Sequence, residues 1–140
     1  VIITQDKDLL QVPGYFLSLG TKKHNEYAEQ GKVFKISKDE GLRNFYEQLL
    51  TGDSVDNIPG LYQLTGQKVT KVIKDKLRLD AEVTEDYYYR YVLETYKLAF
   101  GAKDIEDLEC ILWEIGNLLY IRRTLEAEEW NHKCPDWDYA

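Results

Sequence analysis

Short apolar runs dominate the first part of the chain. Residues 1–4 and 15–19 are rich in β-branched and aromatic side chains, which predicts two strands, the first of them buried. Residues 6–10 between them predict a short helical turn. Residues 21–31 are polar and predict an exposed turn or hairpin tip, and residues 32–36 predict the strand that returns from it. The chain therefore opens with a small sheet.

Helical periodicity replaces this pattern after residue 36. Ser37 followed by Glu40 is a capping box, so a helix is expected from there to about residue 50. Residues 51–60 are rich in Gly, Pro, Asp and Asn and predict a loop with specified turns. Helical spacing resumes near residue 67, and its apolar face is formed by Val69, Val72, Ile73 and Leu77. Two long amphipathic helices are expected at residues 85–100 and 105–123, before an aromatic, irregular tail. Strands followed by helices predict one mixed α/β domain with an α-rich C-terminal lobe.

Charge is distributed unevenly along the 140 residues. The net charge of −7 argues at first against a nucleic-acid partner. Residues 65–78, however, hold five basic side chains and one acidic one, so a locally basic helix could still bind a phosphate backbone. No apolar run approaches the roughly 20 residues that span a bilayer, and the two cysteines have no metal-ligand spacing. A cytoplasmic protein with reduced thiols and no membrane partner is expected.

The beginning of the chain suggests a longer protein. The sequence contains no methionine and starts with Val1-Ile2-Ile3, which resembles the middle of a strand. A natural chain seldom starts directly at a buried strand. We therefore expect these residues to be the later part of a longer chain.

Two pairs of aspartates stand out. Asp6 and Asp8 follow an apolar strand directly, at the rim where open α/β sheets bind ligands, although an Asp there can simply cap the next helix. Asp53 and Asp56 lie in the Gly- and Pro-bounded loop, where Asx-turns are the simpler explanation of either alone. Together the pairs offer four hard oxygen donors, the ligands that Mg²⁺ and Mn²⁺ prefer. A divalent metal site is the sharper hypothesis.

Glycines and lysines follow the loop in an order typical of a helix–hairpin–helix element. Gly60 and Gly66 bound the hairpin, and the helix expected after it carries Lys68 and Lys71 on one face. Backbone N–H groups in such a hairpin can bind phosphate, and the two lysines can hold adjacent phosphates. A merely solvated basic helix is the alternative. Because none of these groups reads a base edge, the expected binding is independent of sequence.

These motifs together resemble a known family. Asp6-Lys7-Asp8-Leu9-Leu10-Gln11 followed by Gly52-Asp53-Ser54-Val55-Asp56-Asn57-Ile58-Pro59-Gly60 is similar to the 5′ nuclease superfamily. That family includes the 5′→3′ exonuclease domain of bacterial DNA polymerase I, flap endonucleases and phage 5′→3′ exonucleases. The resemblance covers about the first 75 residues. Residues 104–130 resemble the C-terminal part of short phage exonucleases more weakly.

The resemblance implies a fold and an activity. Residues 1–51 would end a PIN-like or Rossmann-like mixed α/β sheet, and residues 52–140 would form a helix–three-turn–helix element and a helical C-terminal lobe. The implied enzyme is a 5′→3′ exodeoxyribonuclease or flap endonuclease of the bacterial or phage-infected cytoplasm, and these 140 residues alone are expected to be inactive. It would hydrolyse DNA that carries a 5′ end or flap by a two-metal mechanism.

The same resemblance assigns residues. Asp6, Asp8, Asp53 and Asp56 would be catalytic ligands in the complete enzyme, mostly of the second of its two Mg²⁺ or Mn²⁺ ions. The DNA backbone would be bound by Gly60, Gly66, Lys68 and Lys71.

Two departures from the family pattern favour an alternative. The usual glycine-rich hairpin, approximately PGVPGVG, is replaced by Leu61-Tyr62-Gln63-Leu64-Thr65-Gly66, one residue longer and without the central glycine. The remaining metal ligands of the family come from an N-terminal half that would have to be supplied by the longer chain or by a separate subunit. A non-catalytic helix–hairpin–helix DNA-binding module derived from such a nuclease is therefore the second hypothesis.

Other candidates are weaker. His24 and His132 have no nucleophile at a telling spacing, and a catalytic role for either is not expected. The run Tyr87-Tyr88-Tyr89-Arg90-Tyr91 could stack on bases, but its helical spacing favours packing in the core. Cys110 falls on the apolar side of its helix, and burial is expected.

Overall fold

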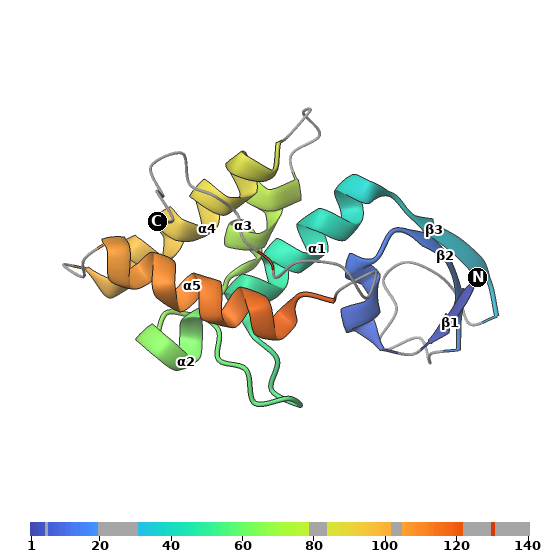
Figure 1. Cartoon of the computed structure of the whole chain (residues 1–140), viewed down its shortest axis with the longest axis horizontal. Helices are drawn as coiled ribbons and strands as arrows, with labels where there is room; N and C mark the ends of the chain where they lie inside the picture. The colour runs from blue at the N-terminus through green and yellow to red at the C-terminus, as the bar shows by residue number, and fades with distance from the viewer. Residues whose placement is uncertain (5, 20–30, 79–83, 102–104, 122–129, 131–140) are drawn as a thin grey trace. The chain divides into compact units, whose positions relative to one another are not determined.

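A computed structural model describes the chain except at residues 5, 20–30, 79–83, 102–104, 122–129 and 131–140 (Figure 1). The protein is a mixed α/β chain. It divides into two compact units, Val1–Phe45 and Tyr46–Ala140. The boundary falls inside the helix α1 (Lys38–Thr51), six residues before the end of that helix. The expected hairpin tip, the aromatic tail after Trp130 and both histidines lie outside the described residues.

The first unit contains a three-stranded sheet of order β1-β2-β3. Strand β1 (Ile2–Thr4) pairs in parallel with β2 (Gly14–Ser18), and β2 pairs antiparallel with β3 (Val33–Ile36). The three predicted strands are therefore confirmed, each to within one residue at either end. A parallel pair needs a crossover connection, and the described part of the β1–β2 connection contains the 3₁₀ helix η1 (Lys7–Gln11).

The two faces of this sheet differ in burial. Phe16 and Ile36 are buried on one face, and the Phe16 ring stacks on that of Phe34 with centroids 5.6 Å apart. On the other face Ile3 and Tyr15 are exposed. The expectation of a fully buried first strand was therefore wrong. Strand β1 is an edge strand of the described sheet, so its apolar run is covered on one face only.

Helix α1 begins as predicted. The Ser37 N–H donates to Glu40 Oε2 at 2.8 Å, and the Glu40 N–H donates to Ser37 Oγ at 3.1 Å, which is a complete capping box. The first turns of the helix hold η1 in place. A Cβ at Gly41 would lie 2.5 Å from the Gln11 carbonyl oxygen, and the Asn44 side chain donates to the Leu10 carbonyl at 2.9 Å.

The second unit is helical. It contains the end of α1, α2 (Leu61–Thr65), α3 (Lys71–Asp75), the 3₁₀ turn η2 (Lys76–Arg78), α4 (Glu85–Phe100) and α5 (Ile105–Leu119). The bounds of α4 are as predicted, because Thr84 caps it through the Tyr87 N–H and Gly101 follows its last turn. Helix α5 ends four residues earlier than predicted. Helix α2 was not predicted, since five residues are too few to show a helical period.

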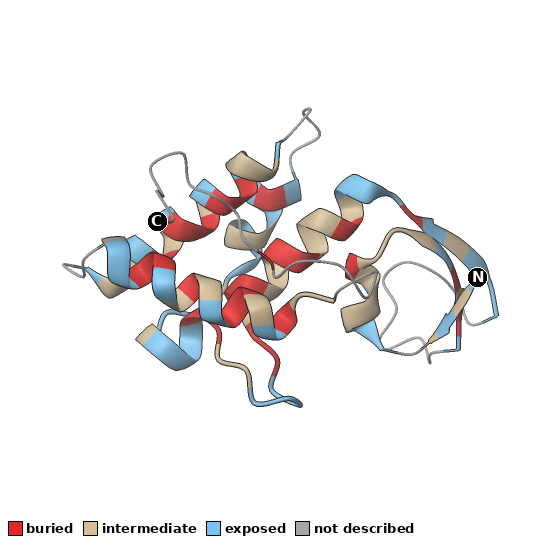
Figure 2. Ribbon diagram, in the orientation of Figure 1, coloured by how far each residue is buried: buried red, intermediate tan, exposed pale blue. Residues whose placement is uncertain are grey.

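The core of this unit lies between α4, α5 and the end of α1, and Figure 2 shows buried residues on the facing sides of α4 and α5. Tyr88 and Tyr89 are buried, so the packing interpretation of the tyrosine run is confirmed for these two. Trp130 is buried against Gly116, where a Cβ would lie 2.2 Å from the indole ring. Cys110 is exposed, and its predicted burial was wrong. No helix within the described ranges is both long and apolar enough to cross a membrane.

Candidate functional site

The loop after α1 is closed by two glycines whose backbones touch. A Cβ at Gly52 would lie 2.5 Å from the Gly60 nitrogen, and a Cβ at Gly60 would lie 2.4 Å from the Thr51 carbonyl carbon. Gly52 also has a φ of +68°, in the left-handed region that ends many helices, and its N–H donates to the Gln48 carbonyl at 2.7 Å. Both glycines of the sequence motif are therefore required by close approach of the backbone.

Asp53 is fixed in this loop by both its backbone and its side chain. Its N–H and carbonyl exchange hydrogen bonds of 2.9 and 2.8 Å with Ile58. Its Oδ1 accepts the Val55 N–H at 2.9 Å and the Asp56 N–H at 3.4 Å, so the Asx-turn that the sequence allowed is present. Only 3% of the residue is exposed. The carboxylate is thus buried in a specified orientation.

Asp56 lies at the exposed tip of the same loop. Asn57 follows it with a φ of +57°, the left-handed conformation that Asn tolerates better than most residues and that turns the chain back toward Ile58. One carboxylate oxygen of Asp56 and one of Asp53 lie within 4.8 Å of each other. The loop thus presents two hard oxygen ligands side by side.

Asp6 and Asp8 belong to the first unit. Asp6 is the N-cap of η1, and its Oδ1 accepts the Asp8 N–H at 2.9 Å. The capping role considered for this aspartate is therefore present in the structure. Asp6 is exposed and Asp8 half-buried. The structure thus brings Asp53 and Asp56 together within the second unit and Asp6 and Asp8 together within the first. That the two pairs share one metal site stays a prediction.

The connection expected to bind phosphate runs from Gly60 to Thr70. Gly60 precedes α2, and its N–H donates to Gln63 Oε1 at 2.9 Å. Gly66 ends α2 in the left-handed region, and its N–H donates to the Tyr62 carbonyl at 2.8 Å. The Gln67 N–H donates to Thr65 Oγ1 at 3.1 Å. These three backbone donors already have partners inside the protein, so side chains are the better candidates for phosphate contacts.

The two lysines assigned to DNA lie on different elements. Helix α3 begins at Lys71, because Thr70 is its N-cap and accepts the Ile73 N–H at 3.4 Å. Lys68 therefore lies in the extended segment before the helix, and the prediction that both lysines share one helical face was wrong. Val72, expected on the apolar face, is 66% exposed, so that expectation was also wrong. Lys71 forms an exposed ion pair of 3.7 Å with Asp75.

Two neighbouring cations pair with a carboxylate on another helix. Glu47 on α1 forms ion pairs with Lys74 at 3.8 Å and with Arg78 at 3.3 Å. These contacts fix α3 and η2 against the end of α1. One carboxylate therefore balances two cations, and the surface around α3 keeps a local positive excess.

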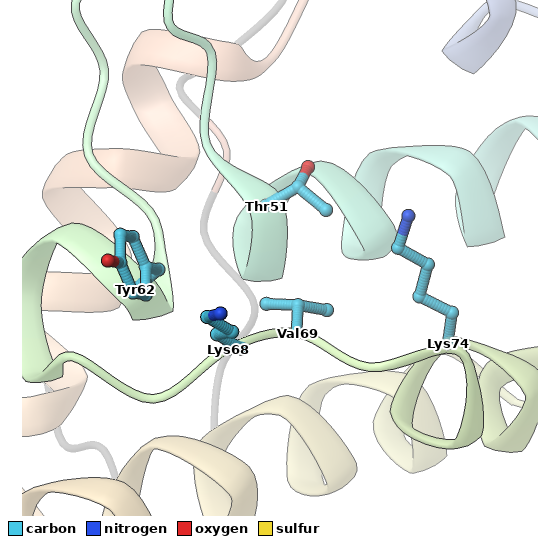
Figure 3. A pocket seen from close by; sticks show the side chains of 5 residues that line it. All are labelled: Thr51, Tyr62, Lys68, Val69 and Lys74. Carbon is cyan, nitrogen blue, oxygen red and sulfur yellow. The ribbon is translucent and has the colours of Figure 1, made fainter.

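Sequence reasoning did not identify a groove next to the loop. It has a volume of about 470 Å³ and is lined by Thr51, Tyr62, Lys68, Val69 and Lys74 (Figure 3). The lining comes from the end of α1, from α2, from the segment before α3 and from α3 itself. Basic residues in this stretch were noted in the sequence. The position of Tyr62 beside them depends on α2, which was not expected.

Three tyrosine hydroxyls donate hydrogen bonds between helices, and that of Tyr96 bonds the end of α1, which precedes the loop. The Tyr96 hydroxyl donates to the Leu49 carbonyl at 2.6 Å, and burial raises the pKa of Tyr96 above its ordinary value of 10.0. Burial, and after it the adjacent negative charge of Glu85, raises the pKa of Tyr46, whose hydroxyl donates to Glu85 Oε1 at 2.8 Å. Burial likewise raises the pKa of Tyr91, which donates to the Ile73 carbonyl at 2.9 Å. All three stay neutral and act as hydrogen-bond donors between helices.

Comparison with known proteins adds no relative. No protein-family model matches the chain, and neither a curated protein nor a solved structure matches it.

Proposed function

We propose that this chain is part of a metal-dependent 5′ nuclease that hydrolyses DNA phosphodiester bonds. The observation that carries the proposal is the loop from Gly52 to Gly60. It buries Asp53 and sets one of its carboxylate oxygens within 4.8 Å of one from Asp56. The motif that resembles the 5′ nuclease superfamily is this same loop.

Burial of Asp53 supports a ligand role beyond the Asx-turn. Removing a carboxylate from water is costly unless its charge is compensated, and a second carboxylate nearby adds repulsion. An exposed aspartate makes the same local hydrogen bond at Asp6 without that cost. A divalent cation bound by Asp53 and Asp56 would offset both the desolvation and the repulsion, and Mg²⁺ or Mn²⁺ suits an all-oxygen donor set.

The proposed roles divide between the two units. Asp53 and Asp56 hold metal from the second unit, and the resemblance gives Asp6 and Asp8 as further ligands. Two divalent cations, when bound, supply an activated water and neutralise charge on the leaving oxygen. The four carboxylates keep the cations in place and do not act as proton donors. Lys68 and Lys71 bind backbone phosphates, which makes binding independent of sequence.

The experiment that tests this proposal is Asp56→Ala in the full natural chain. Asp56 is exposed at a loop tip, so the substitution leaves the fold intact and removes one metal ligand. Cleavage of a 5′-labelled duplex in Mg²⁺ should fall by at least about a hundredfold, since two-metal sites depend on each ligand. Asp39→Ala, at an exposed position near the start of α1, is the matched control and should cleave like the wild type. Undiminished cleavage by Asp56→Ala would overturn the ligand assignment.

The second hypothesis is a DNA-binding module without catalysis. The same two proteins, wild type and Asp56→Ala, distinguish it from the nuclease. It is favoured by the Asx-turn, which gives Asp53 a structural role that needs no metal. A module of this kind would bind DNA with unchanged affinity when Mg²⁺ is chelated, and neither wild type nor Asp56→Ala would cleave. A Mg²⁺-dependent product from the wild type alone would exclude it.

A further inference from the structure

The groove beside the loop combines an aromatic face with positive charge. Tyr62 is 52% exposed at one end, and Lys68 lies between it and Val69 (Figure 3). Lys74 lies at the other end, where its ammonium pairs with Glu47. Lys68 is itself exposed. An exposed tyrosine thus lies near an exposed cation in the lining of one groove.

The lining is chemically one-sided. It holds two cations and no acidic residue, although the chain as a whole carries a net charge of −7. Glu47 is shared between Lys74 and Arg78, so it does not neutralise both. An anionic ligand is favoured by this charge, and a flat apolar group beside the anion is favoured by the tyrosine ring. A volume of about 470 Å³ is within the usual range of small-ligand sites.

A nucleotide combines an anion with a flat apolar group. The Tyr62 ring indicates whether that nucleotide is paired or unpaired. Bases inside a duplex are covered by their neighbours, so an aromatic side chain stacks only on a base that is unpaired. We infer that the groove is a subsite for one unpaired nucleotide of a nucleic-acid strand, with its base against Tyr62 and its phosphate at Lys68. This inference rests on the proposed function and deepens it, because it names the residues of this chain that would hold an unpaired nucleotide of the bound nucleic acid.

The test measures binding by the full natural chain with divalent metal chelated, so that cleavage plays no part. The probes are a short labelled oligothymidylate and a blunt hairpin duplex without unpaired bases. Tyr62→Ala should weaken oligothymidylate binding by about tenfold and leave duplex binding unchanged. Tyr62→Phe keeps the ring and should bind like the wild type. Lys68→Ala should weaken both probes and reduce the slope of log affinity against log salt by about 1.

A second aromatic–lysine pair provides the matched control. Tyr15 is 55% exposed on β2, and Lys35 Nζ lies 5.6 Å from its ring centroid, outside the groove. Tyr15→Ala should therefore bind both probes like the wild type. An equal loss from Tyr15→Ala and Tyr62→Ala would mean that any exposed tyrosine contributes, and would overturn the inference.

Two further outcomes would also overturn it. Equal loss of both probes in Tyr62→Ala would mean that the ring supports the fold and not an unpaired base. Full competition by inorganic phosphate, with no effect of Tyr62→Ala, would mean that the groove binds the anion only. The proposed nuclease can fail separately: oligothymidylate binding that depends on Tyr62, in a full chain that never cleaves in Mg²⁺, would keep the subsite and reject the catalysis.

Discussion

Asp6 and Asp53 make the same local hydrogen bond in two different surroundings. Each is the first aspartate of its pair, and each accepts a backbone N–H two residues further on at 2.9 Å. Asp6 does so in the open, at the start of a 3₁₀ turn, whereas Asp53 is 3% exposed. Local sequence therefore determines the turn in both places, and the surrounding backbone determines whether the carboxylate is buried.

The difference lies in what encloses each turn. The Asp6 turn is held from one side, by Asn44 and Gly41 of α1. The Asp53 loop is closed at both ends by Gly52 and Gly60 and crossed by the bonds to Ile58. An exposed aspartate is sufficient for capping. Burial makes the charge of a carboxylate more costly, so a bound cation would stabilise the Asp53 loop more than the Asp6 turn.

Opening the closed loop should give the largest effect. In Gly52→Ala the new Cβ would meet the Gly60 nitrogen at 2.5 Å, at a φ of +68° that alanine disfavours. We expect a loss of about 3 kcal/mol or more in the free energy of unfolding, measured with urea. Gly66→Ala is the control, since its φ is +79° but its Cβ would meet nothing within 4 Å. It should cost about 1 kcal/mol. Equal losses would show that backbone conformation alone, and not the close approach, requires Gly52.

The next largest effect should come from replacing Asp53 or Asp6 by asparagine, and the two variants should differ in how far a divalent cation stabilises them. Asn keeps an acceptor oxygen for the turn and removes the charge. A saturating divalent cation, at about 100 times its dissociation constant, should stabilise the wild type by about 2.7 kcal/mol. Asp53→Asn should abolish that stabilisation. Asp6→Asn should leave the unfolding of the metal-free chain unchanged and reduce the stabilisation less. Thermal unfolding with and without Mg²⁺ or Mn²⁺ measures the stability of the metal-free chain and its stabilisation by the cation. An equal response of Asp53→Asn and wild type would contradict metal binding at the loop.

The comparison also shows how far the sequence could predict this protein. Strong local signals were read correctly: the capping box at Ser37, the strands and the bounds of α4. The split of Lys68 from Lys71 was missed, because one threonine cap at residue 70 outweighed the helical spacing around it. The groove beside Tyr62 and the burial of Asp53 could not be predicted, since the exposure of both residues depends on parts of the chain that the fold brings together. The metal and DNA assignments stay predictions.

Removing the hydrogen bond that holds η1, the turn after Asp6, should have a smaller effect. The Asn44 side chain donates to the Leu10 carbonyl at 2.9 Å, across 34 residues of sequence. Asn44→Ala leaves that carbonyl without this donor and should cost about 1–2 kcal/mol. Amide exchange should rise at η1 and stay unchanged at residues 53–58 of the second unit. Leu42→Ala, another half-buried position of α1, is the control for a general loss of packing. If the two variants loosen η1 equally, the hydrogen bond is not what holds it.

Titration of Tyr96 should give the smallest effect, and it acts on the base of the closed loop. The Leu49 carbonyl lies in the last turn of α1, where no helical N–H follows to bond it, and the Tyr96 hydroxyl is its donor. The phenol ionises near its ordinary pKa of 10.0 in the unfolded chain and at a higher pH in the folded one. Its contribution to the free energy of unfolding is therefore complete below about pH 10 and is lost as the pH rises toward the folded pKa, by at most about 1.4 kcal/mol per pH unit.

Tyr96→Phe should be less stable at neutral pH by about 1 kcal/mol, the value of one hydrogen bond, and should lose stability less steeply above pH 10. Urea unfolding between about pH 7 and pH 11 measures the two slopes. Parallel slopes would mean that Tyr96 ionises alike in both states, and that the hydroxyl bond does not secure the end of α1.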